Sequence, residues 1–154
     1  MNKKQLKSIA IVFGFILMSG CSGKHVTVRD NTLCLDGCSP LPNCVSSTTR
    51  ILYNRTSPFE LLMPSQEAWP MIKDAISHIP RTEIMEYNDT YIHAKCRTRV
   101  FRFVDNLELV LQPDMKTVSV RSSSTIAISD LNVNRMRIYR LRNQLEKMGI
   151  IKTN

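Results

Sequence analysis

The first twenty-one residues of this 154-residue chain constrain its fold most, because they decide the compartment in which the rest folds. A short start with three lysines precedes an apolar run, Ile9–Met18, and the residues Ser19, Gly20 and Cys21 follow. The run is shorter than the roughly 20 residues that span a membrane, and small residues after it are typical of a removable signal peptide. The pattern predicts a lipoprotein signal peptide at 1–20 and lipidation of Cys21, with an ordinary secreted product as the alternative.

Lipid on Cys21 would make the membrane a partner of the chain. Each acyl chain contributes roughly 0.8 kcal/mol per buried methylene, and two or more chains anchor a protein stably. The residue after the cysteine is Ser22. An aspartate at that place retains lipoproteins at the inner membrane in typical Gram-negative envelopes, so Ser22 predicts a lipid-anchored protein of the cell envelope at the outer membrane.

Four further cysteines, Cys34, Cys38, Cys44 and Cys96, would then fold in an oxidising compartment, which favours disulfides. Four cysteines allow three pairings, and all three stay open. Because three lie in a Pro-rich segment and Cys96 in a strand-like run, we expect one bridge to tie the N-terminal segment to the sheet. It would close a loop of about 50–60 residues and contribute roughly 3–4 kcal/mol. The cysteine spacing suits zinc poorly, so no metal and no cofactor is predicted.

The charge of the chain admits anionic partners. The formal net charge is +8, and three of these charges belong to the leader, which leaves about +5 on the remainder. Lipopolysaccharide, phospholipid headgroups or peptidoglycan would suit such a surface, although solubility explains a charge of this size equally well. No signature of a nucleic-acid-binding protein is present, so nucleic acid is not predicted as a partner.

One amphipathic helix is predicted from Ser65 toward Ile79, with Trp69 on its apolar stripe. Pro70 is tolerated only near a first turn, so the regular helix can begin late. Pro80 ends it. We interpret the stripe as core, with ligand stacking on Trp69 as the alternative.

A second helix follows Ser129 or Asp130, either of which can cap it, and Gly149 is a natural stop. Its mostly apolar face comprises Asn134, Ile138, Leu141, Leu145 and Met148. The remainder is covered largely by basic residues: Arg135, Arg137, Arg140, Arg142 and Lys147. They form either a solvated outer face or a patch for acidic headgroups.

Between the helices, alternating side chains predict strands joined by short turns. The predicted strands are Glu83–Tyr87, Tyr91–Val104 with a bend near Val100, Leu107–Leu111, and a further one at Val118 and Val120. The predicted turns are Asn88-Asp89, Asp105-Asn106 and Pro113-Asp114. Such an order predicts an antiparallel meander.

Together these elements predict an α+β fold. We expect a single antiparallel β-sheet of three to five strands, packed by two main helices, with a disulfide-bearing irregular N-terminal segment. The domain organisation would be the signal peptide at 1–20, a lipidated tether at 21–32 and a single α+β domain at 33–154. About 133 residues after Cys21 are enough for a real core.

Polar residues gather around one strand end and the start of the second helix: Arg121, Ser122, Ser124, Asp130, Asn134 and Arg135. Arginines and hydroxyls at a helix N-terminus suit anions, so this cluster is a possible anion site. The alternative is a buried structural network in which Asp105 pairs with Arg121 or Arg135.

No catalytic residue is predicted. No serine lies in a Gly-x-Ser-x-Gly sequence, and metal-binding spacing of His, Asp and Glu is absent. The pair His93 and Asp105 is the arrangement that an enzyme would use here, if both lay in one pocket.

Three stretches stand out from ordinary packing. These are Pro42-Asn43-Cys44-Val45-Ser46-Ser47, Phe101-Arg102-Phe103-Val104-Asp105, and Arg121-Ser122-Ser123-Ser124 with the downstream Asp130-Leu131-Asn132-Val133-Asn134-Arg135. Over roughly 33–145 the chain resembles an uncharacterised family of bacterial envelope and plastid proteins, the domain of unknown function 1499 (DUF1499). The family usually has a second acid at Asn106, arginine at Thr125 and glycine at Asn132. The resemblance implies an envelope lipoprotein and names no reaction.

We therefore expect a non-catalytic envelope module that binds an anionic lipid or glycan or an envelope protein, or that has a structural role. The alternative is an enzyme that acts on envelope glycan or lipid.

Overall fold

The computed structural model describes residues 26–125 and 132–153. The predicted leader, Cys21, Ser22 and Asp130 lie outside these residues. Within them the fold is α+β, as predicted, with helices α2 (Ser65–Ser77) and α3 (Val133–Lys147) and the short 3-10 helix η2 (Leu52–Asn54). None of the described helices is both long and apolar enough to span a bilayer.

The described strands form a six-stranded antiparallel sheet and a separate two-stranded hairpin. The large sheet has the order β3-β8-β7-β6-β5, and β4 also pairs with β8. Its strands are β3 (Cys44–Ser46), β4 (Phe59–Glu60), β5 (Thr82–Tyr87), β6 (Tyr91–Arg97), β7 (Val104–Leu111) and β8 (Thr117–Ser124). The hairpin consists of β1 (Val26–Arg29) and β2 (Thr32–Leu35). The prediction of a single sheet of three to five strands is therefore wrong.

The two extra strands lie along one edge of β8. β3 pairs with 121–123 and β4 with 117–118, so the two share the edge that β7 does not occupy. With three and two residues, they are too short to show the alternation by which a strand is recognised in a sequence. That is why the sequence predicts strands only between the two helices and neither β3 nor β4.

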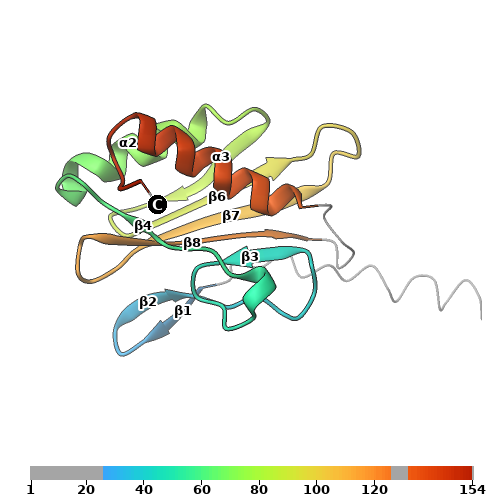
Figure 1. The fold of residues 1–154 in the computed structure, drawn as a ribbon, viewed down its shortest axis with the longest axis horizontal. Helices are drawn as coiled ribbons and strands as arrows, with labels where there is room; N and C mark the ends of the chain where they lie inside the picture. Colours follow the sequence, from blue (N-terminus) through green and yellow to red (C-terminus); the bar gives the residue numbers. More distant parts are fainter. Residues whose placement is uncertain (1–25, 126–131, 154) are drawn as a thin grey trace, which may run out of the picture.

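The sheet is covered on both faces, in three layers (Figure 1). Helices α2 and α3 lie on one face, over the apolar side chains of Ile92, Leu107, Leu109 and Val120. The β1–β2 hairpin lies on the other face, where Leu35 packs with Tyr91 and Val110. β7 is central in the sheet, and its side chains are buried on both faces from Asp105 onward.

Helix α2 begins at Ser65 and accepts Pro70 in its sixth position, so it does not begin late. Trp69 belongs to the core with 3% of its surface exposed, and its indole N–H donates to the carbonyl of Asn88 at 2.7 Å. This contact fixes the helix to the β5–β6 turn. The interpretation of the Trp69 stripe as core is confirmed.

Helix α3 ends where the sequence predicts, because Gly149 takes the left-handed conformation with φ of 69°. Its predicted apolar face is buried except at Met148, which is 41% exposed. The residues that follow Gly149 return to the core: Ile150 and Ile151 are buried, and Ile151 forms a bridge with Leu61 beside β4.

Two local predictions between β6 and β7 are wrong. β6 ends at Arg97, and Arg99–Phe101 forms a turn rather than a bent continuation of the strand. Asp105 and Asn106 do not form a turn; they pair with Cys96 and Lys95 inside the sheet. The predicted strand segment, rich in aromatic and β-branched residues, thus forms the turn. The predicted turn, Asp105-Asn106, lies in an extended strand.

The predicted tether at 21–32 contains regular structure in its second half. β1 begins at Val26 and pairs with β2 from Val26–Leu35 to Arg29–Thr32. Asp30 and Asn31 make the tight turn with positive φ, a conformation in which Asn and Asp are enriched.

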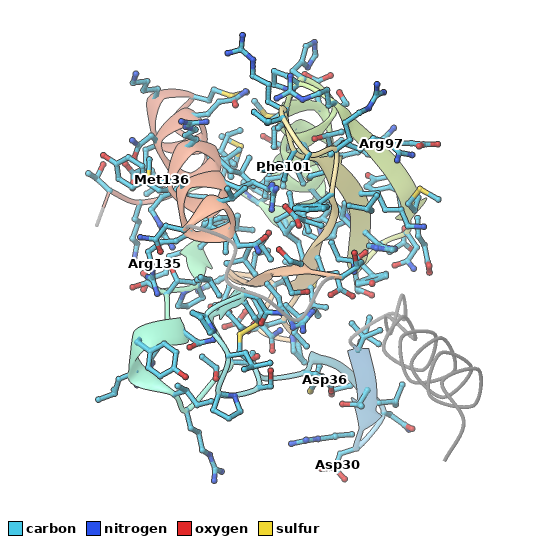
Figure 2. The ribbon with its side chains drawn as sticks, turned by 90° about the vertical axis from the view of Figure 1, so that its right-hand side faces the viewer. Asp30, Asp36, Arg97, Phe101, Arg135 and Met136 are labelled. Atoms are coloured by element: carbon cyan, nitrogen blue, oxygen red, sulfur yellow. A yellow bond between two sulfur atoms is a disulfide. The ribbon has the colours of Figure 1, made fainter. Side chains whose placement is uncertain are left out.

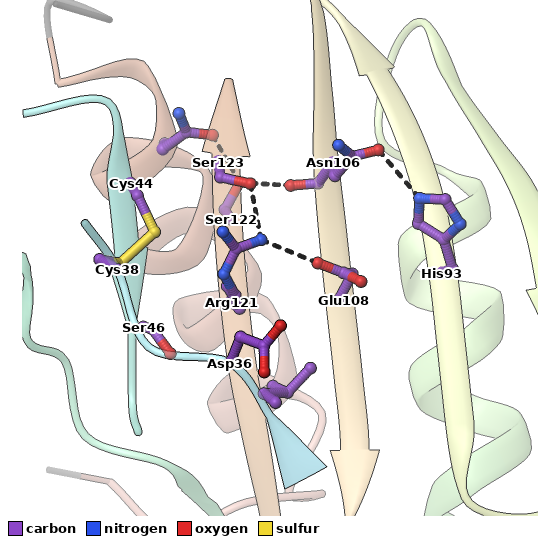
Figure 3. A network of polar contacts seen from close by, with 12 residues as sticks. Asp36, Cys38, Cys44, Ser46, His93, Asn106, Glu108, Arg121, Ser122 and Ser123 are labelled. Atoms are coloured by element: carbon purple, nitrogen blue, oxygen red, sulfur yellow. Dashed lines mark hydrogen bonds and ion pairs between the residues drawn. A yellow bond between two sulfur atoms is a disulfide. The ribbon is translucent and has the colours of Figure 1, made fainter. Parts of the chain in front are cut away.

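The disulfide joins Cys38 to Cys44, whereas Cys34 and Cys96 are free thiols. The expected long-range bridge to the strand of Cys96 is thus wrong. Cys96 lies on the helix-covered face with Ile92 and Ala94. Cys44 and its bonded partner lie by the opposite face, next to Arg121 (Figure 3). The bridge constrains the short loop before β3 and nothing further along the chain.

A thiol count tests this pairing. Unfolded under non-reducing conditions, a chain carrying Cys21→Ser should titrate two thiols, and peptide mapping should recover Cys38 linked to Cys44. Replacing both bonded cysteines by serine should lower the free energy of unfolding by about 2 kcal/mol, because the closed loop is short. Cys34→Ser is the control and should change stability little. Recovery of Cys96 in a disulfide would contradict the structure.

Candidate functional site

Strands β7 and β8 carry two polar networks on opposite faces of the sheet. Successive residues of a strand point to opposite faces, so Asp105 faces the helices while Asn106 and Glu108 face the hairpin side. On β8, Ser122 faces the helices and Arg121 does not. The predicted cluster of polar residues is therefore divided by the sheet.

The network on the helix side joins α3 to β7 and β8. Arg137 forms an ion pair with Asp105 at 2.5 Å and donates to Ser122 Oγ at 2.8 Å. Ser122 Oγ in turn donates to Asn134 Oδ1 at 2.6 Å. The amide nitrogen of Asn134 donates to Ser124 Oγ at 3.0 Å. It also donates, at 3.1 Å, to the carbonyl of Asn43, which immediately precedes β3. Helix, central sheet and disulfide loop thus meet at one fully buried asparagine.

The sequence analysis placed Arg137 with the basic residues of the outer helix face and missed it as the partner of Asp105. Asp105 pairs neither with Arg121, which lies on the opposite face, nor with Arg135, which points elsewhere on α3. The signal available in the sequence was the i, i+3 spacing of Asn134 and Arg137, which brings both to one side of a helix. Their contact is confirmed by a hydrogen bond of 2.5 Å between Arg137 and Asn134 Oδ1.

The network on the hairpin side is centred on Arg121 (Figure 3). Arg121 donates to Glu108 Oε2 at 3.0 Å and to Ser123 Oγ at 2.8 Å, and Tyr91 donates to the other Glu108 oxygen at 2.9 Å. All four residues are buried. Burial lowers the pKa of Arg121, an effect opposed by the charges of Glu108 and of Asp36, which lies beside it in Figure 3. Burial also raises the pKa of Tyr91, so the phenol stays a donor.

His93 and Asp105 do not form the pair that an enzyme would use. His93 pairs across the sheet with Glu108 in register, and its Nε2 lies 2.9 Å from Asn106 Oδ1 (Figure 3). Asp105 is on the other face, bonded to Arg137. Within residues 26–125 and 132–153, no three His, Cys, Asp or Glu side chains lie close enough to hold a metal ion.

Arg135 fastens η2 to the start of α3. Its guanidinium donates to the carbonyl of Arg55 at 3.1 Å and to that of Tyr53. Arg142, predicted on an outer face, is buried: it donates to the carbonyl of Ser57 at 2.5 Å and stacks on Phe59 at 4.7 Å. Both arginines bind backbone carbonyls of the segment before β4 and so serve its packing.

A cavity of about 370 Å³ opens beside the helix-side network. It lies between the α2–β5 connection, the end of β6 with the residues that follow it, and one side of α3. Five arginines line it: Arg81, Arg97, Arg99, Arg137 and Arg140. None of the described residues that line it is an aspartate or glutamate.

Most of the positive charge of this cavity is not neutralised by the described part of the chain. Arg137 is the exception, because Asp105 pairs with it. The other four arginines are exposed, and none takes part in an ion pair among the described residues. Like charges held close together repel one another, and an anion would relieve that repulsion.

The floor of the cavity is apolar. Cys96 and Leu141 are almost fully buried there, and Ile79 is half-buried. Burial raises the pKa of the Cys96 thiol, against the opposing effects of Arg137 and of the hydrogen bond from Thr82. The thiol is therefore neutral at ordinary pH and behaves as a small apolar group.

Comparison with known proteins gives a family and no activity. The model of a family described as "Protein of unknown function (DUF1499)" matches residues 34–145. No curated protein and no solved structure matches the chain.

The helix-side network predicts a stability difference between two neighbouring arginines. Arg137→Met leaves the Asp105 carboxylate buried without its partner, which costs about 3–5 kcal/mol. Arg135→Met is the control; it removes exposed hydrogen bonds and should cost about 1 kcal/mol. Urea unfolding followed by circular dichroism measures both.

Adding Asp105→Asn to Arg137→Met should restore part of the loss, because the uncompensated charge is gone. Equal losses in the two single variants, or no recovery in the double variant, would show that the ion pair does not hold the helix to the sheet.

Proposed function

Because the chain belongs to the DUF1499 family, whose description states no activity, we propose a function from the cavity itself: the protein binds a small anionic ligand that has an apolar portion. It does so as a lipid-anchored protein of the bacterial envelope. The observation that carries the proposal is the group of five arginines around the cavity, with no carboxylate among the described lining residues.

The arginines come from three separate parts of the chain and converge only in the fold. Arg81 follows α2, Arg97 and Arg99 lie at the end of β6, and Arg140 lies on α3. A cation near the end of a helix is explained by the helix dipole, and this accounts for Arg81 after α2. It does not account for Arg99 and Arg140, which belong to other elements. Guanidinium groups that converge in this way suit phosphate or carboxylate, which they bind by paired hydrogen bonds.

The size and the floor of the cavity specify the rest of the ligand. About 370 Å³ is at the small end of the range for ligand sites. The apolar floor at Cys96 and Leu141 favours a short hydrocarbon portion over a fully hydrated anion. An alkyl phosphate or a short fatty acid has this combination of properties.

Anchoring by lipid on Cys21 rests on the leader, with its lysines, its short apolar run and its small residues before the cysteine. Ser22 after the cysteine supports the outer membrane as the destination. An anchored protein would meet membrane-derived anions at high local concentration, which suits a cavity of this chemistry.

Octyl phosphate serves as the probe for the cavity, and octyl glucoside as its uncharged counterpart. We expect octyl phosphate alone to bind, and Arg140→Glu to weaken it at least about tenfold, since a hydrogen bond to a charged group contributes about 1.5–3 kcal/mol. Isothermal titration calorimetry at low and high salt measures the affinity.

The matched control is Arg50→Glu, which makes the same change in net charge at an exposed residue outside the cavity lining. It should leave the affinity unchanged. Equal binding of the charged and uncharged probes, or equal losses in the two variants, would refute an anion site in this cavity.

Lipidation is tested on Cys21→Ser. The unchanged chain should be found in the membrane fraction with an acylated N-terminal cysteine by mass spectrometry, and the variant should carry no lipid mass. Cys34→Ser, a cysteine change within β2, should stay acylated. Acylation that survives Cys21→Ser would refute the assignment.

A further inference from the structure

The connection between β6 and β7 exposes apolar side chains that the core does not take up. In the loop Thr98–Phe103, Val100 is 76% exposed, Phe101 70% and Phe103 43%. Figure 1 shows this connection extending beyond the end of the sheet, and Figure 2 looks onto that side of the molecule, with Arg97 and Phe101 labelled. A contiguous apolar projection of this kind marks an interaction site.

The loop has a defined structure. Its ends are joined by two hydrogen bonds of 2.9 Å, from the Thr98 N–H to the Phe103 carbonyl and from the Phe103 N–H to Thr98 Oγ1. Arg102 takes a left-handed conformation with φ of 55°, which reverses the chain. The rings of Phe101 and Phe103 stack with centroids 5.4 Å apart. These contacts hold the loop in one conformation in which the apolar side chains are exposed to solvent.

Positive charge surrounds the apolar side chains. Arg97, Arg99 and Arg102 are all exposed, and residues 97–103 include no aspartate or glutamate. Aromatic side chains with interleaved arginines fit the boundary of an anionic bilayer, where the rings enter the acyl region and the guanidinium groups stay at the phosphates.

We propose that the loop Thr98–Phe103 inserts into the surface of a bilayer that contains anionic phospholipid. Charge complementarity identifies an anionic bilayer as the binding partner of the loop. The arginines would bind the anionic headgroups, and the aromatic rings would enter the hydrocarbon beneath them. Thr98 and Arg99 also line the cavity described above, so insertion brings its mouth to the level of the headgroups. The insertion does not depend on the ligand proposed for the cavity.

The experiment places a tryptophan at the tip of the loop and measures its depth. Full-length protein carrying Phe101→Trp is reconstituted into phosphatidylcholine vesicles with or without phosphatidylglycerol, using brominated acyl chains as the quencher. The unchanged protein gives the background, because its tryptophan, Trp69, is 3% exposed. We expect loss of the new fluorescence in vesicles with phosphatidylglycerol, and recovery of it in high salt.

Leu62→Trp is the matched control. Leu62 is 57% exposed and follows β4 at the opposite end of β7, near the turn after Leu111. Both tryptophans share the same anchor, so only insertion of the loop distinguishes them. Quenching at both positions, quenching at neither, or quenching at position 101 that is independent of phosphatidylglycerol would overturn the proposal.

Two further variants separate this proposal from the cavity site. Arg140→Glu in the Phe101→Trp protein should keep the quenching, since Arg140 is outside the loop. Val100→Ser with Phe103→Ser in the Phe101→Trp protein should weaken the quenching and leave the affinity for octyl phosphate unchanged. If the cavity does not bind octyl phosphate, the quenching still tests the loop. If the loop does not insert, the affinity for octyl phosphate still tests the cavity.

Discussion

The arrangement of this fold depends on one buried ion pair, between Arg137 of α3 and Asp105 of β7. Both side chains are nearly or fully removed from water, at 9% and 1% exposure. Charges in such surroundings are tolerated when each has its partner and further hydrogen bonds, and Ser122 and Asn134 supply most of these. The second Asp105 oxygen has no partner among the described residues. Arg137 in turn forms part of the cavity wall, so the pair that holds the helix also positions one side of the candidate site.

Elements with long, regular periodicity could be predicted from the sequence. Helices α2 and α3 and the strands of the β5–β8 meander were recognised in this way, with errors at their ends. β3 and β4 could not be, because strands this short are defined by the edge of β8 that accepts them. The Asp105-Asn106 pair was misread as a turn because its residue types favour turns, whereas pairing with β6 and β8 holds it extended.

The candidate site could be predicted only in part. The polar residues around the start of α3 were recognised, but which of them meet depends on the face of the sheet that each occupies. Arg121 and Ser122 are adjacent in sequence and lie in different networks for this reason. The arginines of the cavity have no common spacing in the sequence. The stretches that carry the family resemblance do converge, since the Asn43 carbonyl, Ser122 and Asn134 are joined by hydrogen bonds. Asn132, which precedes α3, has φ of 68°, a conformation that asparagine tolerates.

The two networks also act against misfolding. Because side chains alternate between faces, a shift of β8 by one residue would carry Arg121 to the side of the helices and Ser122 away from Asn134. Arg121 would then lie opposite Leu107 or Leu109 in place of Glu108, and an unpaired charge would enter an apolar layer. A slipped β8 would thus lose the Arg121–Glu108 ion pair and the Ser122–Asn134 hydrogen bond at once. The buried charges make the pairing of the central strands unique, at a place where apolar residues of similar shape would tolerate several alignments.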